Sequence, residues 1–268
     1  MRLGFMTSGT AEDAKFARKY GFDCLEVALF QDTPLFANSR DFKKACDAEG
    51  VPIAAVSLFG QDYTSTDEAV RKDTAARLLK TGELAAALGA PIAISGSGSG
   101  PSPHAPLKDK WDRSIEVLRP LIAKIHALGL KFAFYNCHWA NEVNTPPAWE
   151  YVLPKLPGTA IKFDPSHPVY DNRDWMPDLQ AAGPNIVHAH AKDVLRVNGK
   201  LIPDPNPGLG QINWGAFFGL LYEAKYDAAV CIEPHGPIYS GERRHPALVM
   251  SGRYLRQFMI PASAGPKL

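Results

Sequence analysis

The chain has 268 residues, of which 46% are hydrophobic and 21% are charged, and its formal net charge is +1. This composition supplies enough apolar side chains for a large core and excludes disorder for most of the chain. The near-neutral charge, without any long block of basic residues, argues against nucleic acid as a partner.

Short apolar runs recur along the chain and predict eight β-strands. The runs occupy residues 2–6, 22–30, 51–59, 90–97, 130–137, 160–164, 185–191 and 227–234. Between them, apolar residues at three- and four-residue spacing predict helices over residues 11–20, 39–49, 66–88, 108–128, 174–183, 213–225 and 245–259.

The regular alternation of strand and helix predicts an α/β protein with a (β/α)8 TIM-barrel fold. Since such barrels form one domain of about 250 residues, we expect a single domain over residues 1–260 and a flexible C-terminal tail over 261–268. A doubly wound open sheet is the alternative, because alternation alone does not show whether a sheet closes. The lack of a GxGxxG motif after the first predicted strand argues against it.

Two segments interrupt this pattern. The glycine-rich segment 95–106 follows the fourth predicted strand, and it is compatible with either a phosphate-binding loop or an exposed loop, although it lacks the Lys of a P-loop. Residues 196–214 form the longest stretch without periodicity. They predict a lid or an irregular excursion over the barrel mouth.

The cysteines and the hydropathy pattern predict a cytoplasmic location. The four cysteines include no CxxC pair, and three of them lie in apolar runs, which is typical of buried free thiols in a reducing compartment. No stretch approaches about 18 uninterrupted apolar residues, and acidic residues follow the N-terminus too soon for a signal peptide. We therefore expect no membrane partner.

Metal-capable side chains gather at the ends of the last four predicted strands, where a TIM barrel builds its active site. They are Asn136 and His138, Asp164 and His167, His190 with Lys192 and Asp193, and Glu233 with His235. A single His at a strand end is more often a hydrogen-bonded structural residue, but an Asp, a His and a Glu on three successive strands favour a metal site. Their mixed oxygen and nitrogen donors suit a divalent ion, with Mn²⁺ or Mg²⁺ ahead of Co²⁺ or Zn²⁺ because carboxylates dominate.

Strand periodicity assigns roles within two of these groups. His188 and His190 face the same way because side chains alternate along a strand, and His190 lies nearer the mouth. We expect His190 to bind the ion and His188 to lie deeper, as a supporting or core residue. After the sixth predicted strand, Asp164 is the expected ligand, while His167 in the following loop either contacts substrate or stabilises the loop.

Further residues are candidates for substrate binding. Glu26 lies in an apolar run, where an unpaired carboxylate is costly to bury, so it faces the mouth or a cation as a substrate or acid/base group, or pairs with a Lys or Arg. Lys192 is placed to neutralise an oxyanion or a phosphate, or to pair with Asp193. Trp139, His104 and His235 are candidates to line the pocket.

The motifs "YNCHW", "FDPSH", "HAHAKD" and "CIEPH", in this order, resemble those of the xylose-isomerase-like TIM-barrel superfamily of sugar and sugar-phosphate isomerases and epimerases. The resemblance runs from "EDAKFARKYGFDCLEV" to "IEP" and covers nearly the whole chain. It implies that Asp164, His190 and Glu233 bind a metal ion and that His167 contacts substrate.

The fifth strand departs from this pattern. Ketose 3-epimerases of the superfamily carry a Glu there that is both ligand and base, whereas this chain reads Tyr135-Asn136-Cys137-His138, with no carboxylate. Either His138 completes the coordination, or Asn136 does and Glu142 reaches in from the loop as the base. We favour His138 as the ligand.

The resemblance implies a divalent-metal-dependent isomerase or epimerase that removes a proton next to a carbonyl of a small-molecule sugar or sugar derivative. Glu233, Glu142 and His167 are its candidate catalytic residues. The departure on the fifth strand keeps open a lyase or dehydratase acting on a keto-sugar, keto-inositol or 3-oxo-glycoside.

Two other functions are less consistent with the sequence. Apurinic endonucleases of the superfamily need more ligands and a basic groove, and a non-catalytic sugar-binding subunit does not explain the retained ligands. A homodimer is a further possibility that the family suggests.

Overall fold

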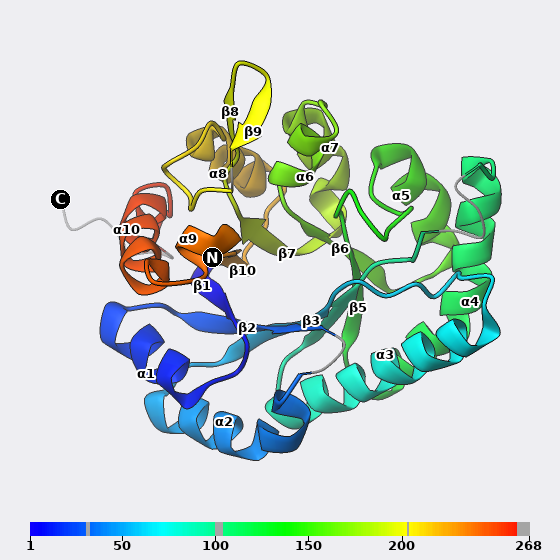
Figure 1. Ribbon diagram of the computed structural model, residues 1–268, viewed down its shortest axis with the longest axis horizontal. Coiled ribbons are helices and arrows are strands. Elements are labelled where there is room, and N and C mark those ends of the chain that lie inside the picture. The colour runs from blue at the N-terminus through cyan, green and yellow to red at the C-terminus, as the bar shows by residue number, and fades with distance from the viewer. Residues whose placement is uncertain (31–32, 100–103, 203, 262–268) are drawn as a thin grey trace.

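The computed structural model describes residues 1–30, 33–99, 104–202 and 204–261, and a closed barrel of parallel strands lies at its centre (Figure 1). The strands are β1 (Arg2–Thr7), β2 (Cys24–Leu29), β3 (Ile53–Leu58), β4 (Ile92–Ser95), β5 (Lys131–Tyr135), β6 (Thr159–Phe163), β7 (Ile186–Ala191) and β10 (Ala229–Ile232). Their order around the barrel is β1-β10-β7-β6-β5-β4-β3-β2. The predicted TIM barrel is therefore confirmed, and the open sheet is wrong.

Helices surround the barrel and return the chain to the start of each next strand (Figure 1). The predicted ones are α1 (Ala11–Tyr20), α2 (Leu35–Glu49), α3 (Glu68–Leu88), α4 (Leu107–Ala127), α7 (Trp175–Ala182), α8 (Trp214–Glu223) and α10 (Arg244–Arg256). At the N-terminus of α1 the Thr10 side chain accepts a hydrogen bond from the Asp13 backbone, and at its end Gly21 takes a left-handed conformation. Such local signals allow these helices to be predicted from the sequence.

Several short elements are too brief to show a helical period. They are α5 (Pro146–Val152), α6 (Ser166–Tyr170), α9 (Gly236–Tyr239) and the 3₁₀ turns η1 (Leu153–Lys155) and η2 (Gly183–Asn185). Two of them, α6 and α9, directly follow the ends of β6 and β10. They therefore lie at the mouth of the barrel.

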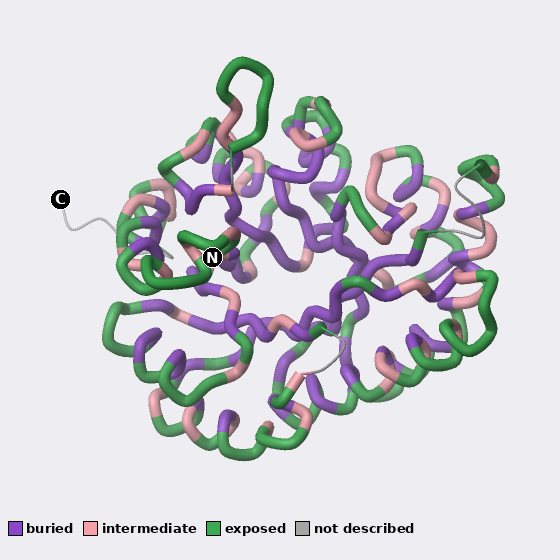
Figure 2. The backbone as a smooth tube through the Cα atoms, in the orientation of Figure 1, coloured by how far each residue is buried: buried purple, intermediate pink, exposed green. Residues whose placement is uncertain are grey.

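Buried side chains lie on both faces of the barrel wall and alternate along each strand, because successive side chains point to opposite faces. In β5, Phe132 and Phe134 are fully buried in the large cluster that includes the helices. Ala133 and Tyr135 belong instead to a smaller cluster of the barrel interior. Figure 2 shows the strands as buried and the outer helix faces as exposed. Burial of each Phe side chain stabilises the fold by about 1.5–3 kcal/mol.

The segment predicted as a lid contains the antiparallel hairpin of β8 (Leu195–Val197) and β9 (Lys200–Ile202), which projects from the barrel in Figure 1. Its turn residues Asn198 and Gly199 both have positive φ, as a two-residue hairpin turn requires. The buried Asp193 carboxylate holds the rest of the segment. It accepts hydrogen bonds from the backbone of Gly208, Gly210 and Ile212 and from the indole of Trp214.

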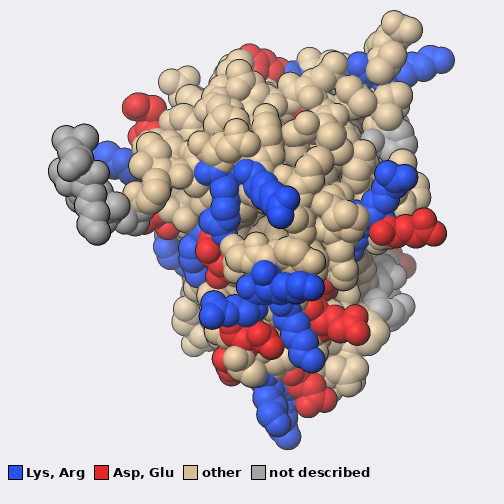
Figure 3. Space-filling view, turned by 90° about the vertical axis from the view of Figure 1, so that its left-hand side faces the viewer, with Lys and Arg blue, Asp and Glu red and all other residues tan. Residues whose placement is uncertain are grey.

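Several further expectations bear on the described residues. All four cysteines are buried and free. Among the described helices, none is both long and apolar enough to cross a membrane. On the face shown in Figure 3, Lys and Arg side chains lie among Asp and Glu side chains. Most of the predicted tail, residues 262–268, and part of the glycine-rich loop, residues 100–103, lie outside the described residues.

Candidate metal and substrate site

Three predicted ligands converge at the C-terminal ends of neighbouring strands. Asp164 follows β6, His190 lies in β7 and Glu233 follows β10, and these strands are adjacent in the barrel. One donor atom from each residue lies within 4.8 Å of the other two. His190 Nδ1 is 2.8 Å from Glu233 Oε2 and 3.8 Å from Asp164 Oδ2. The three side chains thus surround a space of atomic size.

The Asp164 carboxylate has one satisfied and one unsatisfied oxygen. Oδ1 accepts hydrogen bonds from the Ser166 backbone at 2.9 Å and from its hydroxyl at 2.7 Å. Oδ2 is buried and has no hydrogen-bond partner among the described residues. A buried charged oxygen without a partner is costly, and a cation at this point would remove the cost. Two carboxylates and one imidazole are therefore a donor set that fits a divalent ion.

Glu26 supports His190 from below. Its Oε2 lies 2.6 Å from His190 Nε2 and 2.7 Å from His188 Nε2, while Oε1 accepts a 2.6 Å hydrogen bond from the Ser57 hydroxyl. When Nε2 of His190 donates to this carboxylate, Nδ1 faces Asp164 and Glu233. A carboxylate behind a ligating His fixes the ring orientation and its tautomer.

The surroundings of Glu26 correct two expectations. The residue is fully buried and both its oxygens are engaged inside the barrel, so the structure does not place it at the mouth as a substrate group. Its partners are histidines rather than a Lys or Arg. Burial opposes ionisation, but His190 and His188 hold the pKa of Glu26 well below its ordinary value. His188 lies deeper than His190, as predicted from strand periodicity.

Two lysines flank the carboxylates. Lys192 Nζ is 3.7 Å from Asp164 Oδ2 and 3.5 Å from Glu233 Oε1. Lys162, which sequence reasoning missed, is fully buried in β6, with Nζ 3.8 Å from Asp164 Oδ2. The expected alternative pairing of Lys192 with Asp193 is wrong, because Asp193 binds the loop that follows. A charged residue in the apolar run "AIKFD" was the available signal for Lys162.

These charges set the protonation of the site. Burial would raise the pKa of Asp164, but Lys192 and its neighbours lower it to about 2. Burial likewise opposes ionisation of Glu233, whereas Lys192 and His190 hold its pKa well below the ordinary value. Burial lowers the pKa of Lys192, but Glu233 and Asp164 outweigh it and raise the pKa. Near neutral pH the site therefore contains two carboxylates and an ammonium group.

His167 and His138 form a pair beside the cluster. His167 lies in α6 rather than in a loop, is 2% exposed, and has Nε2 3.6 Å from Asp164 Oδ2. Its Nδ1 lies 2.9 Å from Nδ1 of His138, an exposed residue. Burial and the charge of Lys192 hold the pKa of His167 well below its ordinary value, so its ring is neutral. His167, rather than His138, is the imidazole next to Asp164.

The structure does not bring the fifth-strand candidates into the ligand group. That group contains Asp164, His190 and Glu233, and His138 is separated from Asp164 by His167. The Asn136 amide donates to the Asp164 carbonyl and accepts from the Asp164 backbone N–H, both at 2.9 Å. These two hydrogen bonds join the ends of β5 and β6, so the Asn136 amide has a structural role.

Glu142 faces away from the cluster. Its carboxylate is 3.1 Å from Nζ of Lys110 in α4, and its backbone carbonyl accepts a hydrogen bond from the Trp111 indole. The loop turns this way because the Asn141 amide donates to the Tyr135 carbonyl and accepts from the backbone of Ser97. The alternative in which Glu142 reaches in as base is therefore not what the structure shows.

The rim of the mouth holds the remaining candidates. Trp139 is 41% exposed, with its ring 6.5 Å from that of Tyr135, and His104 is exposed just before α4. The exposed His235 has Nδ1 2.8 Å from Oδ2 of Asp204. Asp204 also accepts a hydrogen bond from the Tyr170 hydroxyl.

Sequence reasoning missed both Tyr170 and Asp204. Tyr170 lies in the short helix α6, with its ring 4.8 Å from that of His138. Asp204 reaches the rim only because the β8–β9 hairpin returns the chain there. Neither residue belongs to a motif, so tertiary structure was needed to find them.

Comparisons with known proteins agree with this architecture. A sequence profile of the family described as xylose isomerase-like TIM barrel matches residues 14–256. The chain belongs to this family. The superfamily resemblance inferred from the strand-end motifs is confirmed.

Solved structures of other proteins share the fold at low sequence identity. An IolI protein with a bound zinc atom aligns with a TM-score of 0.80 and 18% identity over 97% of this chain and 99% of that chain. A D-psicose 3-epimerase from Clostridium cellulolyticum H10 aligns with a TM-score of 0.77 and 17% identity, over 96% and 99% of the two chains. A 3-keto-D-glucoside 4-epimerase, YcjR, from E. coli aligns with a TM-score of 0.75 and 19% identity, again over 96% and 99%.

Proposed function

We propose that this protein is a divalent-metal-dependent carbohydrate isomerase or epimerase that removes a proton from the carbon next to a carbonyl. The observation that carries the proposal is the convergence of Asp164, His190 and Glu233 at the mouth, with one Asp164 oxygen lacking a donor. The epimerases that share this fold act on sugars or sugar derivatives, and a small molecule of that class is the proposed substrate.

Asp164, His190 and Glu233 would hold the ion. When bound, it supplies positive charge that stabilises the negative charge developing on a substrate oxygen. The predominance of oxygen donors favours Mn²⁺ or Mg²⁺, while the zinc atom bound in the IolI structure keeps Zn²⁺ and Co²⁺ among the candidates.

Glu233 is the proposed base. It stands at the end of β10, is ionised near neutral pH, and has 8% of its surface exposed toward the mouth. Its carboxylate takes the proton, and the electron pair of the broken C–H bond stays on the substrate as an enediolate. Lys192, 3.5 Å from Glu233 Oε1, donates a hydrogen bond to a substrate oxygen as charge develops there.

His167 and His138 are the proposed path for the second proton transfer. His167 is neutral and buried beside Asp164, and its contact with His138 links it to the exposed rim. A neutral imidazole can give a proton on one side and take one up on the other. The pair can therefore deliver a proton to the substrate and be reprotonated from solvent.

One observation favours a lyase as the second candidate. Around the ligand group, the described residues of β5 and its loop offer amide, phenol and imidazole groups, because the Glu142 carboxylate pairs with Lys110. An epimerase with two opposed carboxylates is thereby less well supported. A β-elimination needs one base and an acid for the leaving group, and Glu233 with His167 supplies both.

Hydrogen exchange in D₂O tests the proposal. The protein is loaded with Mn²⁺, Mg²⁺, Co²⁺ or Zn²⁺ in turn and incubated with ketoses, keto-inositols and 3-oxo-glycosides. Both candidates place deuterium next to the carbonyl, but only the lyase releases a dehydrated product or an aglycone.

Several results of this test would contradict the proposal. One is the lack of deuterium uptake from every substrate class in all four loaded forms. Sugar binding without exchange would favour the non-catalytic subunit, and cleavage of an abasic duplex would favour the endonuclease.

A further inference from the structure

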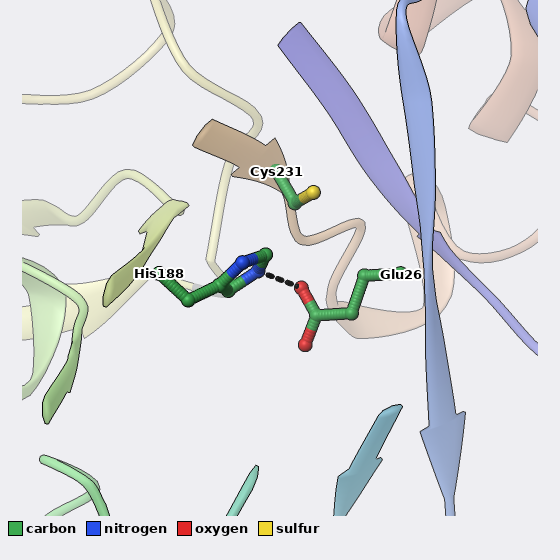
Figure 4. A group of neighbouring side chains, drawn as sticks. All are labelled: Glu26, His188 and Cys231. Atoms are coloured by element: carbon green, nitrogen blue, oxygen red, sulfur yellow. Dashed lines mark hydrogen bonds and ion pairs between the residues drawn. The ribbon is translucent and has the colours of Figure 1, made fainter. Parts of the chain in front are cut away.

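A second group of metal-binding side chains lies inside the barrel, below the mouth. It consists of Glu26 from β2, His188 from β7 and Cys231 from β10; in Figure 4 the first two point toward each other and Cys231 lies beside them. One donor atom from each residue lies within 4.8 Å of the other two, and all three residues are fully buried. Unlike the mouth group, this one contains a sulfur donor, which suits a thiophilic ion.

His188 has an unsatisfied ring nitrogen at this point. Its Nε2 lies 2.7 Å from Glu26 Oε2, but its Nδ1 is buried and has no hydrogen-bond partner among the described residues. Most buried polar atoms in proteins have a hydrogen-bond partner, so the unpaired Nδ1 of His188 is a position where a further ligand would be stabilising.

The adjoining strand β1 leaves room for the thiol. Gly4 of β1 pairs in register with Cys24 on one side and with Cys231 on the other. A Cβ at Gly4 would lie 2.7 Å from the Cys24 sulfur and 2.9 Å from the Cys231 sulfur. Any larger residue at position 4 would therefore press on the thiols of both Cys24 and Cys231.

A cavity borders one member of this group. A cavity of about 470 Å³ opens at the N-terminal end of the barrel, where it is lined by residues such as Arg2, Ile186 and Ala229 at the starts of β1, β7 and β10. His188 also lines this cavity. Of the three side chains, His188 is therefore the one that borders this cavity.

We propose that Glu26, His188 and Cys231 bind a second divalent ion of the thiophilic class, such as Zn²⁺. On binding, the S–H bond of Cys231 is replaced by a bond from sulfur to the ion, and the proton leaves to solvent. His188 takes the ion through Nδ1, the ring nitrogen without a partner, so no ring proton is lost, and Glu26 keeps its contact with His190. The site does not depend on the proposed enzymatic function.

Cobalt binding to the whole protein tests this site. Protein freed of metal by chelation is titrated with Co²⁺, and ions per chain are counted by equilibrium dialysis. We expect two ions per chain and a thiolate-to-cobalt charge-transfer band. Cys231→Ser should lose the band and one ion, whereas Asp164→Asn should lose the mouth ion and keep the band.

Two matched cysteine variants locate the band. Cys137 is buried near Lys192 and Glu233, beside the mouth, so Cys137→Ser tests whether the band arises there instead. Cys46 lies in α2, outside the barrel interior, and Cys46→Ser is the control for a cysteine substitution elsewhere. Both variants should keep the band and bind two ions.

Two outcomes would overturn the proposal. One is a single ion per chain with no charge-transfer band in the unaltered protein, a result that does not depend on how well any variant folds. The other is a band that Cys137→Ser removes and Cys231→Ser retains. A band that Cys231→Ser removes would support this site even if the protein turned over no sugar. In that case only the proposed enzymatic function would be contradicted.

Discussion

The two sides of the barrel interior differ in chemistry although both are built from buried parallel strands. On one side, β6, β7 and β10 carry Asp164, His190 and Glu233 at or just beyond their ends. On the other, β4 and β5 carry Ile94 and Ala133 in an apolar cluster. The fold is the same on both sides, so the inward residues of three neighbouring strands decide where chemistry can occur.

Substitutions on the two sides should have different effects. On the polar side buried charges of opposite sign lie close together, as Lys192 does to Asp164 and Glu233, so removing one charge leaves another uncompensated. On the apolar side a smaller residue leaves a cavity and changes no charge. Substitutions on the first side should alter activity and ion binding, and those on the second should alter the free energy of unfolding.

The largest effect is expected for Glu233→Gln. The amide cannot take up the substrate proton, so turnover by the ion-loaded protein should fall by about 10²–10⁴-fold. The matched control is Glu142→Gln, because Glu142 pairs with Lys110 away from the ligand group. The measurement is steady-state turnover of the substrate found by deuterium exchange. Equal losses in both variants would contradict the assignment of the base.

The apolar side should respond to Ile94→Ala. Ile94 is fully buried, and loss of its side chain should lower the free energy of unfolding by about 2–5 kcal/mol. Chemical denaturation measures this change. The affinity of the folded protein for Mn²⁺, measured calorimetrically at a temperature where both proteins are folded, should stay the same. A large loss of affinity would show that the two sides are not independent.

A smaller effect is expected for Glu26→Gln, which acts behind the ligands. Without a carboxylate at Nε2, His190 loses its fixed tautomer, and Mn²⁺ affinity should fall by about 10–100-fold. Ser57→Ala is the control, since it removes one hydrogen bond from Glu26 and keeps the charge. Unchanged affinity in Glu26→Gln would mean that Glu26 does not position His190.

Much of the architecture could be predicted because the strands of a parallel barrel are buried on both faces and appear as apolar runs. A polar residue at the end of such a run is conspicuous, and this is how Asp164, His190 and Glu233 were found. Glu26 and Lys162 are equally conspicuous inside their runs. Their roles, however, depend on partners from other strands, which no local pattern specifies.

The loops were the least predictable part. The direction of the Glu142 side chain depends on hydrogen bonds of Asn141 with Tyr135 and Ser97. These are tertiary contacts that no local sequence pattern predicts. The helix α6, which holds His167, has only five residues, too few to show a period. The hairpin that places Asp204 had a usable signal, since "NG" at residues 198–199 is typical of a two-residue turn.

The smallest effect is expected at the rim, where His235 pairs with Asp204. The hydrogen bond that His235 donates to Asp204 raises the pKa of His235, although burial opposes it. Burial would raise the pKa of Asp204, but the same bond lowers it. The stability that His235 contributes is thus complete below the ordinary pKa of a histidine, about 6.5. It disappears as the pH rises through the raised pKa.

Asp204 behaves in the opposite sense, so the pair stabilises the rim between the two transitions. Its contribution is present above the ordinary aspartate pKa and is lost as the pH falls through the lowered value. Since the His235 side chain is 50% exposed, solvent screens the pair and the change in stability should be small. NMR titration should show a lower pKa of His235 in Asp204→Asn than in the unaltered protein. An unchanged His235 titration in that variant would mean that the two side chains do not form an ion pair in solution.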